Sequence, residues 1–326
     1  IAWGFTNIGD TQDLFLEQRA AAEPDLFVED GESYRARVET VEIAVKDSAP
    51  VALDIVYTRN GPLISDEPPL SLRWTVQDIG ELGLDGLLAF NRARNWTEFN
   101  AALDRHAAPT LNATYADRDG TIGFRTAGLL PRRGAGVGLV PLPAGKSNRW
   151  QGLVPSAAMP RLSNPEQGFI AAANARVAAP GSATLVSADN AAPYRIARLQ
   201  SVLSEPRQFS RTDMQSLQMD WHDGQAAAVL PAMLAELPAT SFPEERARLQ
   251  AWLAEPIAAP DSAAALLFQA WYLETARAVF EPALGEELLQ RLLGFNYMVN
   301  HALDLSLIHI SEPTRHDSGS RLPSSA

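Results

Sequence analysis

Few residues of this sequence stand in a pattern that could do chemistry. The chain of 326 residues has no cysteine, which excludes disulfides, thiol catalysis and thiolate metal sites. The pattern G-x-S-x-G is absent, so the nucleophile turn of an α/β-hydrolase is not available. The stretch AGKS, residues 144–147, resembles part of a phosphate-binding loop. However, Val140 stands where the first glycine belongs, and Pro141 and Pro143 stiffen the loop, so we expect no phosphate site here.

Histidines and paired carboxylates are the other usual carriers of chemistry. His106, His222 and His301 lie in no metal-binding spacing, and we interpret each as a surface or packing residue. Asp117 and Asp119, in ADRDGT, are better explained by a hairpin turn than by an acid–base pair. Generic motifs therefore assign no reaction to this chain.

The composition limits the class of protein and its partners. With 46% hydrophobic residues, the chain can bury the core of one large domain or of two ordinary ones. A net charge of -12, without any Lys/Arg-rich stretch, argues against nucleic acid or an anionic membrane surface as a partner. No apolar run approaches the roughly 20 residues that a membrane helix needs, so we expect no membrane span.

The C-terminal stretch has an unusual sequence. LSLIHISEPTR, residues 305–315, corresponds to the in-frame translation of a sequencing-library transposase adapter, and RLPSSA resembles the primer tail that follows it. We therefore expect residues 305–326 to be a disordered assembly artefact and take residues 1–304 as the folded part. His309 and His316 are set aside with this tail.

The first part of the chain has the period of strands. Apolar and polar residues alternate over 34–58 with a break at 46–50, which predicts a hairpin, and Asn60-Gly61-Pro62 marks the next turn. The patterns that follow predict a strand over 72–78, helices around an Arg/Asn-rich loop over 87–103, and two strands joined by a turn at 117–120.

The chain changes character after about Pro193. Capped starts and apolar stripes predict helices, among them a segment that opens with a capping-box pattern at Ser210 and is interrupted at Gly224. Strands first and helices afterwards indicate an α+β fold.

Six ordered blocks resemble one protein family over residues 1–304. The blocks are IAWGFTNIGDTQDLFLE, RNGPLIS, AFNRARNWTEFNAAL, NATYADRDGTIGF, GFIAAANAR and PYRIARLQSVL. In order and approximate spacing they are similar to the β subunit of the penicillin acylase family, which includes acyl-homoserine lactone acylases. The resemblance implies a four-layer αββα N-terminal-nucleophile hydrolase core with an appended helical region.

The resemblance also implies a reaction and its nucleophile. In this family a serine freed by self-cleavage attacks a linear amide, and its own α-amine is the base, whose ordinary pKa of about 7.7 to 8.0 suits neutral pH. The block that resembles IAWGFTN follows that serine in the family. We therefore expect the serine and the α subunit to precede Ile1, and this fragment to be inactive alone.

Four residues match functional positions of the family. Asn174 matches a side-chain donor to the oxyanion and Asn7 a backbone donor, the alternative for both being a turn residue. Arg195 matches an arginine near the nucleophile, the alternative being a structural ion pair at a helix start. Leu111 matches an acyl-pocket position, the alternative being a core residue of a strand.

A calcium site is implied by the same resemblance. Asp10, Asp13 and the Gln12 carbonyl match its first ligands, which are oxygens as calcium prefers. Two departures leave the alternative of a solvated turn open: the loop is shorter than the family pattern, and no acid stands near Ala183, where a later ligand is expected. No organic cofactor is implied.

The resemblance finally suggests partners and a location. The substrate is a small N-acyl amide, with an acyl-homoserine lactone as an alternative, and the α subunit of the same precursor is the protein partner. The location implied is periplasmic or secreted. A degenerate, non-catalytic binding or scaffold member of the family remains an alternative of another class.

Overall fold

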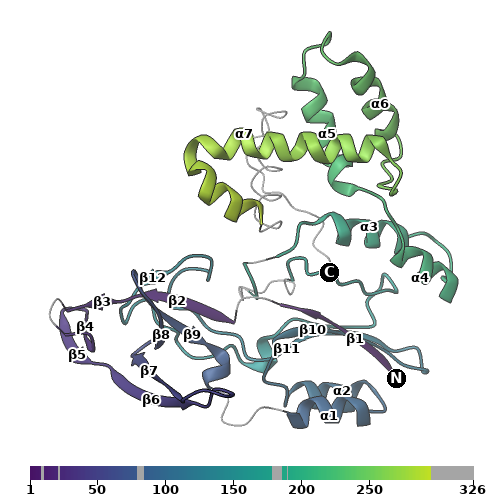
Figure 1. Ribbon diagram of the computed structural model, residues 1–326. Coiled ribbons are helices and arrows are strands. Elements are labelled where there is room, and N and C mark those ends of the chain that lie inside the picture. The colour runs from purple at the N-terminus through teal and green to yellow at the C-terminus, as the bar shows by residue number, and fades with distance from the viewer. Residues whose placement is uncertain (9–10, 21–22, 79–83, 178–185, 189, 295–326) are drawn as a thin grey trace. The chain divides into compact units, whose positions relative to one another are not determined.

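The computed structural model describes residues 1–8, 11–20, 23–78, 84–177, 186–188 and 190–294. They form two compact units, one within residues 1–190 and one that begins at Ala191. The first unit holds the strands with two helices, and the second is helical (Figure 1). The predicted α+β class is confirmed.

A four-stranded antiparallel sheet forms one layer of the first unit. Its strands, in spatial order, are β1 (Ala2–Asn7), β10 (Leu111–Ala116), β11 (Ile122–Ala127) and β13 (Arg161–Ser163). Helices α1 (Leu84–Arg92) and α2 (Trp96–Leu103) cover one face of this sheet (Figure 1). The predicted strand pair around residues 117–120 and the helices over 87–103 are confirmed.

Aromatic packing joins these helices to the sheet. Phe5 and Tyr115 on the sheet pack against Phe90 of α1 and Phe99 of α2. Ring centroids lie 5.5 Å apart for Phe5 and Phe90 and 5.2 Å apart for Phe99 and Tyr115, within the range of favourable aromatic pairs. The period of two in the strands and of 3.6 in the helices thus gathers one apolar core.

A second sheet and a small third one complete the strands of the first unit. The second runs in the order β12 (Leu142–Pro143), β2 (Gln12–Leu16), β9 (Pro69–Trp74), β8 (Gly61–Asp66), β7 (Val51–Thr58) and β6 (Arg37–Ile43). The third consists of β3 (Gln18–Arg19), β4 (Leu26–Glu29) and β5 (Glu32–Arg35). The predicted hairpin over 34–58 is confirmed as β6 and β7.

The strand predicted over residues 72–78 is shorter than expected. It ends at Trp74, and Thr75–Asp78 forms the 3-10 helix η1. The Gln77 side chain accepts from the Trp74 N–H at 3.2 Å and donates to the Leu72 carbonyl at 3.1 Å. This local capture of backbone groups turns the chain out of the sheet, and a period-two pattern does not reveal it.

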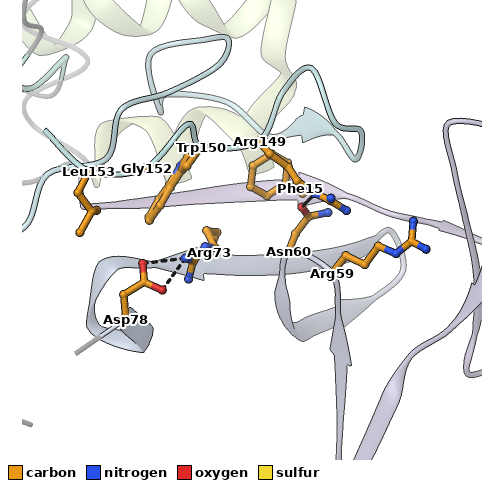
Figure 2. A pocket seen from close by; sticks show the side chains of 9 residues that line it. All are labelled: Phe15, Arg59, Asn60, Arg73, Asp78, Arg149, Trp150, Gly152 and Leu153. Atoms are coloured by element: carbon orange, nitrogen blue, oxygen red, sulfur yellow. Dashed lines mark hydrogen bonds and ion pairs between the residues drawn. The ribbon is translucent and has the colours of Figure 1, made fainter. Parts of the chain in front are cut away.

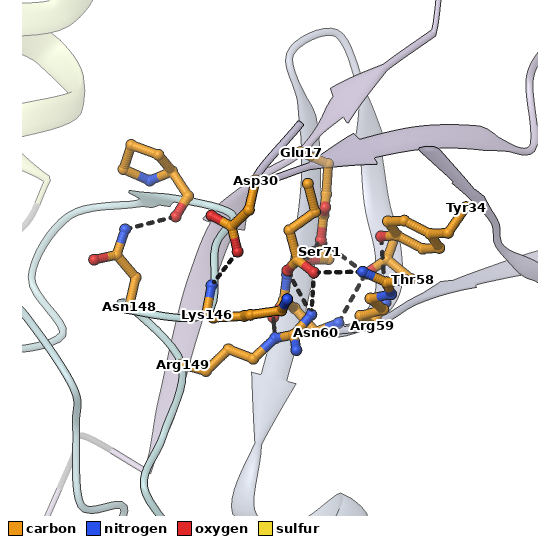
Figure 3. Close-up of polar contacts among 12 residues, drawn as sticks. Glu17, Asp30, Tyr34, Thr58, Arg59, Asn60, Ser71, Lys146, Asn148 and Arg149 are labelled. Atoms are coloured by element: carbon orange, nitrogen blue, oxygen red, sulfur yellow. Dashed lines mark hydrogen bonds and ion pairs between the residues drawn. The ribbon is translucent and has the colours of Figure 1, made fainter. Parts of the chain in front are cut away.

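The buried carboxylate of Glu17 joins segments of the second sheet (Figure 3). One Glu17 oxygen accepts from Thr58 at 2.8 Å, Asn60 at 3.0 Å and Ser71 at 2.6 Å. Because a buried carboxylate is costly unless it is hydrogen-bonded, these three donors stabilise it. The polar side chains of the turn at Asn60 are therefore part of the folded core.

The AGKS stretch is held by the same region. The Lys146 backbone N–H donates to the Asp30 carboxylate at 3.0 Å, as Figure 3 shows. A backbone N–H that already faces an acid is poorly suited to a phosphate. This contact agrees with the expectation that the stretch is no phosphate-binding loop.

The second unit is built from five helices among its described residues. They are α3 (Tyr194–Leu203), α4 (Arg211–Gln218), α5 (Gly224–Glu236), α6 (Pro243–Leu253) and α7 (Ala263–Leu293). The predicted capping box at Ser210 is confirmed, with Asp213 as its second member. At the predicted interruption, α4 has ended and Asp223 caps α5 by accepting from the Ala226 N–H at 2.8 Å.

Buried apolar residues of α5, α6 and α7 form the core of this unit, with Val229, Leu230, Leu249, Phe268 and Tyr272 at its centre. Within the described ranges, we find no helix whose length and hydropathy would let it cross a membrane.

Candidate active site

The two predicted oxyanion donors meet in the first unit. The Asn174 side-chain amide, Nδ2, donates to the Asn7 backbone carbonyl at 3.1 Å and to the Asn7 Oδ1 at 2.6 Å. The two residues are 167 positions apart in the sequence, so no local turn explains the contact. The fold thus brings together two asparagines that the sequence analysis selected separately.

Asn7 ends β1 at an edge of its sheet. The Ile8 N–H donates to the Thr110 carbonyl at 3.3 Å, toward the neighbouring strand β10. In an antiparallel ladder successive residues direct their backbone groups to opposite sides. The Asn7 N–H and C=O therefore point away from β10, toward the side from which Asn174 approaches.

Asn174 has a backbone conformation that few residues adopt. Its φ is 57°, in the left-handed region where asparagine is several-fold enriched. The preceding Ala173 is buried, at 6% exposure. From this conformation the Asn174 amide reaches the carbonyl and the Oδ1 of Asn7.

This arrangement can support an oxyanion. An amide nitrogen carries two hydrogens, so one can keep its bond to the Asn7 carbonyl while the other turns to an incoming ligand. The Asn7 Oδ1 at 2.6 Å holds the place that such a ligand would take. Together with the outward Asn7 N–H, two donors then converge from one side of the sheet edge.

Leu111 and Asn112 face opposite sides of β10. Leu111, at 5% exposure, belongs to the core cluster between the sheet and helices α1 and α2. Asn112 faces the other side, where its Oδ1 accepts from Thr126 at 2.7 Å. The packing of Leu111 agrees with the core alternative, and its acyl-pocket role stays a prediction.

Arg195 belongs to the second unit. It is the second residue of α3, near the helix start, and is exposed. Asn7 and Asn174 belong to the first unit. The predicted role of Arg195 near the nucleophile therefore stays a prediction.

The predicted calcium ligands are only partly described. Asp10 lies outside the described residues, as does the segment around Ala183. Asp13 is 5% exposed, and its two oxygens accept from the Arg133 Nε at 3.1 and 3.0 Å. The Gln12 carbonyl accepts from the Arg133 Nη2 at 3.3 Å. The Asp13 and Gln12 oxygens assigned to calcium bind a guanidinium, so these two residues do not fit a calcium ion as they are arranged.

The described part of the chain contains no cluster of three or more His, Cys, Asp or Glu residues suited to a metal. The sequence analysis missed Arg133 as a partner of Asp13, because the two lie 120 positions apart. Trp150 was missed for the same reason, and its indole N–H also donates to Asp13.

A cavity of about 260 Å³ lies in the first unit (Figure 2). It is lined by Phe15, Arg59, Asn60, Arg73, Asp78, Arg149, Trp150, Gly152 and Leu153. Neither Asn7 nor Asn174 takes part in it.

The arginines of the cavity are all paired with acids. Arg73 donates to both oxygens of Asp78, at 2.6 and 2.7 Å, and Arg59 and Arg149 share the fully buried carboxylate of Glu29. The hydrogen bond from Arg59 to Glu29 raises the pKa of that guanidinium, so Arg59 stays charged. Since the acids already use these guanidinium groups, we assign the cavity a structural role.

Comparisons with known proteins place this chain among acylases. The sequence profile of penicillin amidase matches residues 1–319. The acyl-homoserine lactone acylase QuiP of Pseudomonas syringae pv. tomato is 30% identical over 312 residues, which cover 88% of this chain and 37% of that protein. The penicillin acylase 2 proenzyme of Pseudomonas sp. is 30% identical over 260 residues, which cover 74% of this chain and 32% of that protein.

A solved structure resembles the fold. Thermostable penicillin G acylase from Alcaligenes faecalis superposes with a TM-score of 0.77 and 22% identity, covering 97% of this chain and 62% of that one. This likeness confirms the predicted N-terminal-nucleophile hydrolase fold. The chain spans 37% of the QuiP relative's length. Because the profile matches residues 1–319, the chain belongs to the penicillin amidase family.

Proposed function

We propose that this chain is part of an amidohydrolase that cleaves the linear amide bond of N-acyl substrates. The nucleophile is an N-terminal serine supplied by polypeptide outside these 326 residues. The observation that carries the proposal is the contact of Asn174 Nδ2 with the Asn7 backbone, at 3.1 Å to its carbonyl. Two donors selected as oxyanion ligands lie together at the open side of β1.

The residues of this chain act on the developing charge. The serine oxygen attacks the amide carbonyl and gives its proton to the α-amine of the same residue. The carbonyl oxygen becomes an oxyanion, which accepts from the Asn7 N–H and from the Asn174 Nδ2. The C–N bond then breaks, the amine leaves with the proton, and water hydrolyses the acyl-enzyme. Each such donor contributes about 10²–10³ in rate.

The Asn7 side chain must move for this to happen. Its Oδ1 accepts from Asn174 at 2.6 Å, and the oxyanion replaces it as the partner of that hydrogen. The bond from Nδ2 to the Asn7 carbonyl remains and holds the amide in place. The exchange favours the transition state because a negatively charged oxygen is a stronger acceptor than an amide carbonyl.

A second candidate function is deacylation of N-acyl-homoserine lactones. It is supported by relatives named for that activity, among them QuiP of Pseudomonas aeruginosa, 28% identical over 88% of this chain. Relatives named as penicillin acylases are similarly distant, including penicillin G acylase of Escherichia coli at 28% over 52% of this chain. In both cases we propose an α subunit of the same precursor as partner and a periplasmic or secreted location.

Expression of the complete gene product tests the proposal. Mature protein should release free amine from an N-acyl amide, and a panel of a penicillin and N-acyl-homoserine lactones should rank the two substrate classes. The control is a variant in which the N-terminal serine is replaced by alanine. A gene without a serine at the processing junction, or mature protein without turnover of either class, supports the non-catalytic scaffold instead.

A further inference from the structure

We propose that Arg133 is an internal cation that stands in place of a calcium ion, tying strand β2 to the segment that follows β11. Asp13 lies on β2 and Arg133 lies 120 positions later. A structural metal ion commonly joins two such distant segments by binding oxygens from both. In this chain a guanidinium makes that connection.

The contact has the geometry of a dedicated ion pair. The Arg133 Nε lies 3.1 and 3.0 Å from the two oxygens of Asp13, and the Nη2 lies 3.3 Å from the Gln12 carbonyl. One planar group therefore reaches both of the described oxygen donors that were assigned to calcium. A fork of fixed N–H groups suits this double recognition better than a lysine ammonium does.

Both charges are removed from water. The Arg133 side chain is 7% exposed and the Asp13 side chain 4%. The Trp150 indole N–H, 137 positions from Asp13, donates to the Asp13 Oδ2 as well. The carboxylate thus has a positive partner and an added neutral donor, which a buried carboxylate requires.

A calcium ion in the same place would meet two obstacles. Calcium takes about six to eight oxygen ligands at about 2.3–2.6 Å, and the Asp13 oxygens already accept N–H groups. A divalent ion bound to those oxygens would also lie next to the guanidinium and be repelled by it. Loss of the guanidinium, in contrast, would leave a buried carboxylate that attracts a divalent cation.

The test compares calcium binding with and without the guanidinium. The melting temperature of the wild-type chain is measured with excess Ca²⁺ and with chelator, and terbium(III) is added as a luminescent probe. Trp150 contacts Asp13, so it should sensitise an ion bound there. The variants are Arg133→Met and Arg133→Lys, and Arg132→Met is the matched control because Arg132 donates to the Gln151 carbonyl in the same segment.

For wild type, Arg133→Lys and Arg132→Met, we expect Ca²⁺ to leave the melting temperature of each protein unchanged. None of the three should give sensitised terbium luminescence. Arg133→Met should melt several degrees lower and recover part of this loss in Ca²⁺, with terbium luminescence. The double variant Asp13→Asn/Arg133→Met should lose both responses. If wild type melts higher in Ca²⁺ and sensitises terbium, the proposal is overturned. This wild-type arm decides the question even if Arg133→Met does not fold.

Discussion

Replacement of Arg125 by methionine should destabilise the first unit strongly. Arg125 lies on β11 at 2% exposure and faces the C-terminal end of α2. Its Nη1 donates to the Asn100 carbonyl at 3.0 Å, and its Nη2 donates to Ser156 at 2.6 Å and to Asp104. The guanidinium therefore satisfies a helix C-terminus, where cations are favoured.

The magnitude follows from which partners can return to water. Breaking a buried ion pair costs about 3–5 kcal/mol when the remaining charge stays buried. Asp104 is 55% exposed and can be solvated again, so Arg125→Met should cost about 3 kcal/mol, the low end of this range. Asp104→Asn leaves the Arg125 guanidinium, 2% exposed, without its carboxylate, so it should cost a comparable amount, about 3 kcal/mol.

The assay is urea denaturation in which unfolding is detected by amide hydrogen exchange of peptides from β10 and β11. These peptides report the first unit separately from the helical one. The midpoint shift multiplied by the slope gives the change in the free energy of unfolding. If Arg125→Met costs under about 1 kcal/mol, the guanidinium is not the anchor that its burial indicates.

Three further changes test separate parts of the first unit. Burial lowers the pKa of His106, whose Nε2 donates to the Pro109 carbonyl at 2.7 Å. Below a pH of about 6.5, the unfolded state therefore gains a proton that the folded state does not take up. The free energy of unfolding should be full above that pH and fall by up to about 1.4 kcal/mol per pH unit below it. In His106→Gln the melting temperature should fall less steeply with decreasing pH than in wild type. Equal slopes of melting temperature against pH for the variant and wild type would contradict this prediction. Gly61→Ala should lower the free energy of unfolding by several kcal/mol or prevent folding. The φ of Gly61 is 133°, and a Cβ there would lie 2.0 Å from the Leu72 carbonyl oxygen. A variant with the melting temperature of wild type would refute this clash. Asn95 caps α2, because its side chain accepts from the Glu98 N–H at 2.9 Å. Asn95→Ala should therefore lower the free energy of unfolding in urea by about 1 kcal/mol, and an unchanged value would count against the cap.

Local patterns predicted the elements well where one face is apolar. The alternation over residues 34–58 gave the β6–β7 hairpin, and Ser210 gave the start of α4, because both signals lie within a few residues. The prediction of a strand over 72–78 was wrong beyond Trp74, where the strand ends because the Gln77 side chain accepts from the Trp74 N–H. Such side-chain capture depends on rotamers that a pattern of residue types does not specify.

The site was predictable only through resemblance. Neither periodicity nor spacing connects Asn7 with Asn174, and their contact arises from the fold. The same holds for Asp13, whose acidic turn suggested a metal while its partners Arg133 and Trp150 stand far away in the sequence. Long-range partners decide whether an acid binds a metal ion, an arginine or water.

One pair of variants distinguishes an oxyanion role of Asn174 from a turn role. If the complete, processed gene product is the proposed amidohydrolase, Asn174→Ala should lower kcat by about 10²–10³ with little change in substrate affinity, because the bond from Asn174 strengthens as charge develops on the carbonyl oxygen. Asn7→Ala keeps the backbone N–H and should stay within about threefold of wild type, a difference of under roughly 0.7 kcal/mol.

Self-cleavage and the melting temperature are checked first, so that a loss of folding is not taken for a loss of catalysis. We expect a mature, folded Asn174→Ala with a low kcat beside a nearly normal Asn7→Ala. A mature, folded Asn174→Ala that turns over an amide within about threefold of wild type would contradict it, and Asn174 would then be a turn residue.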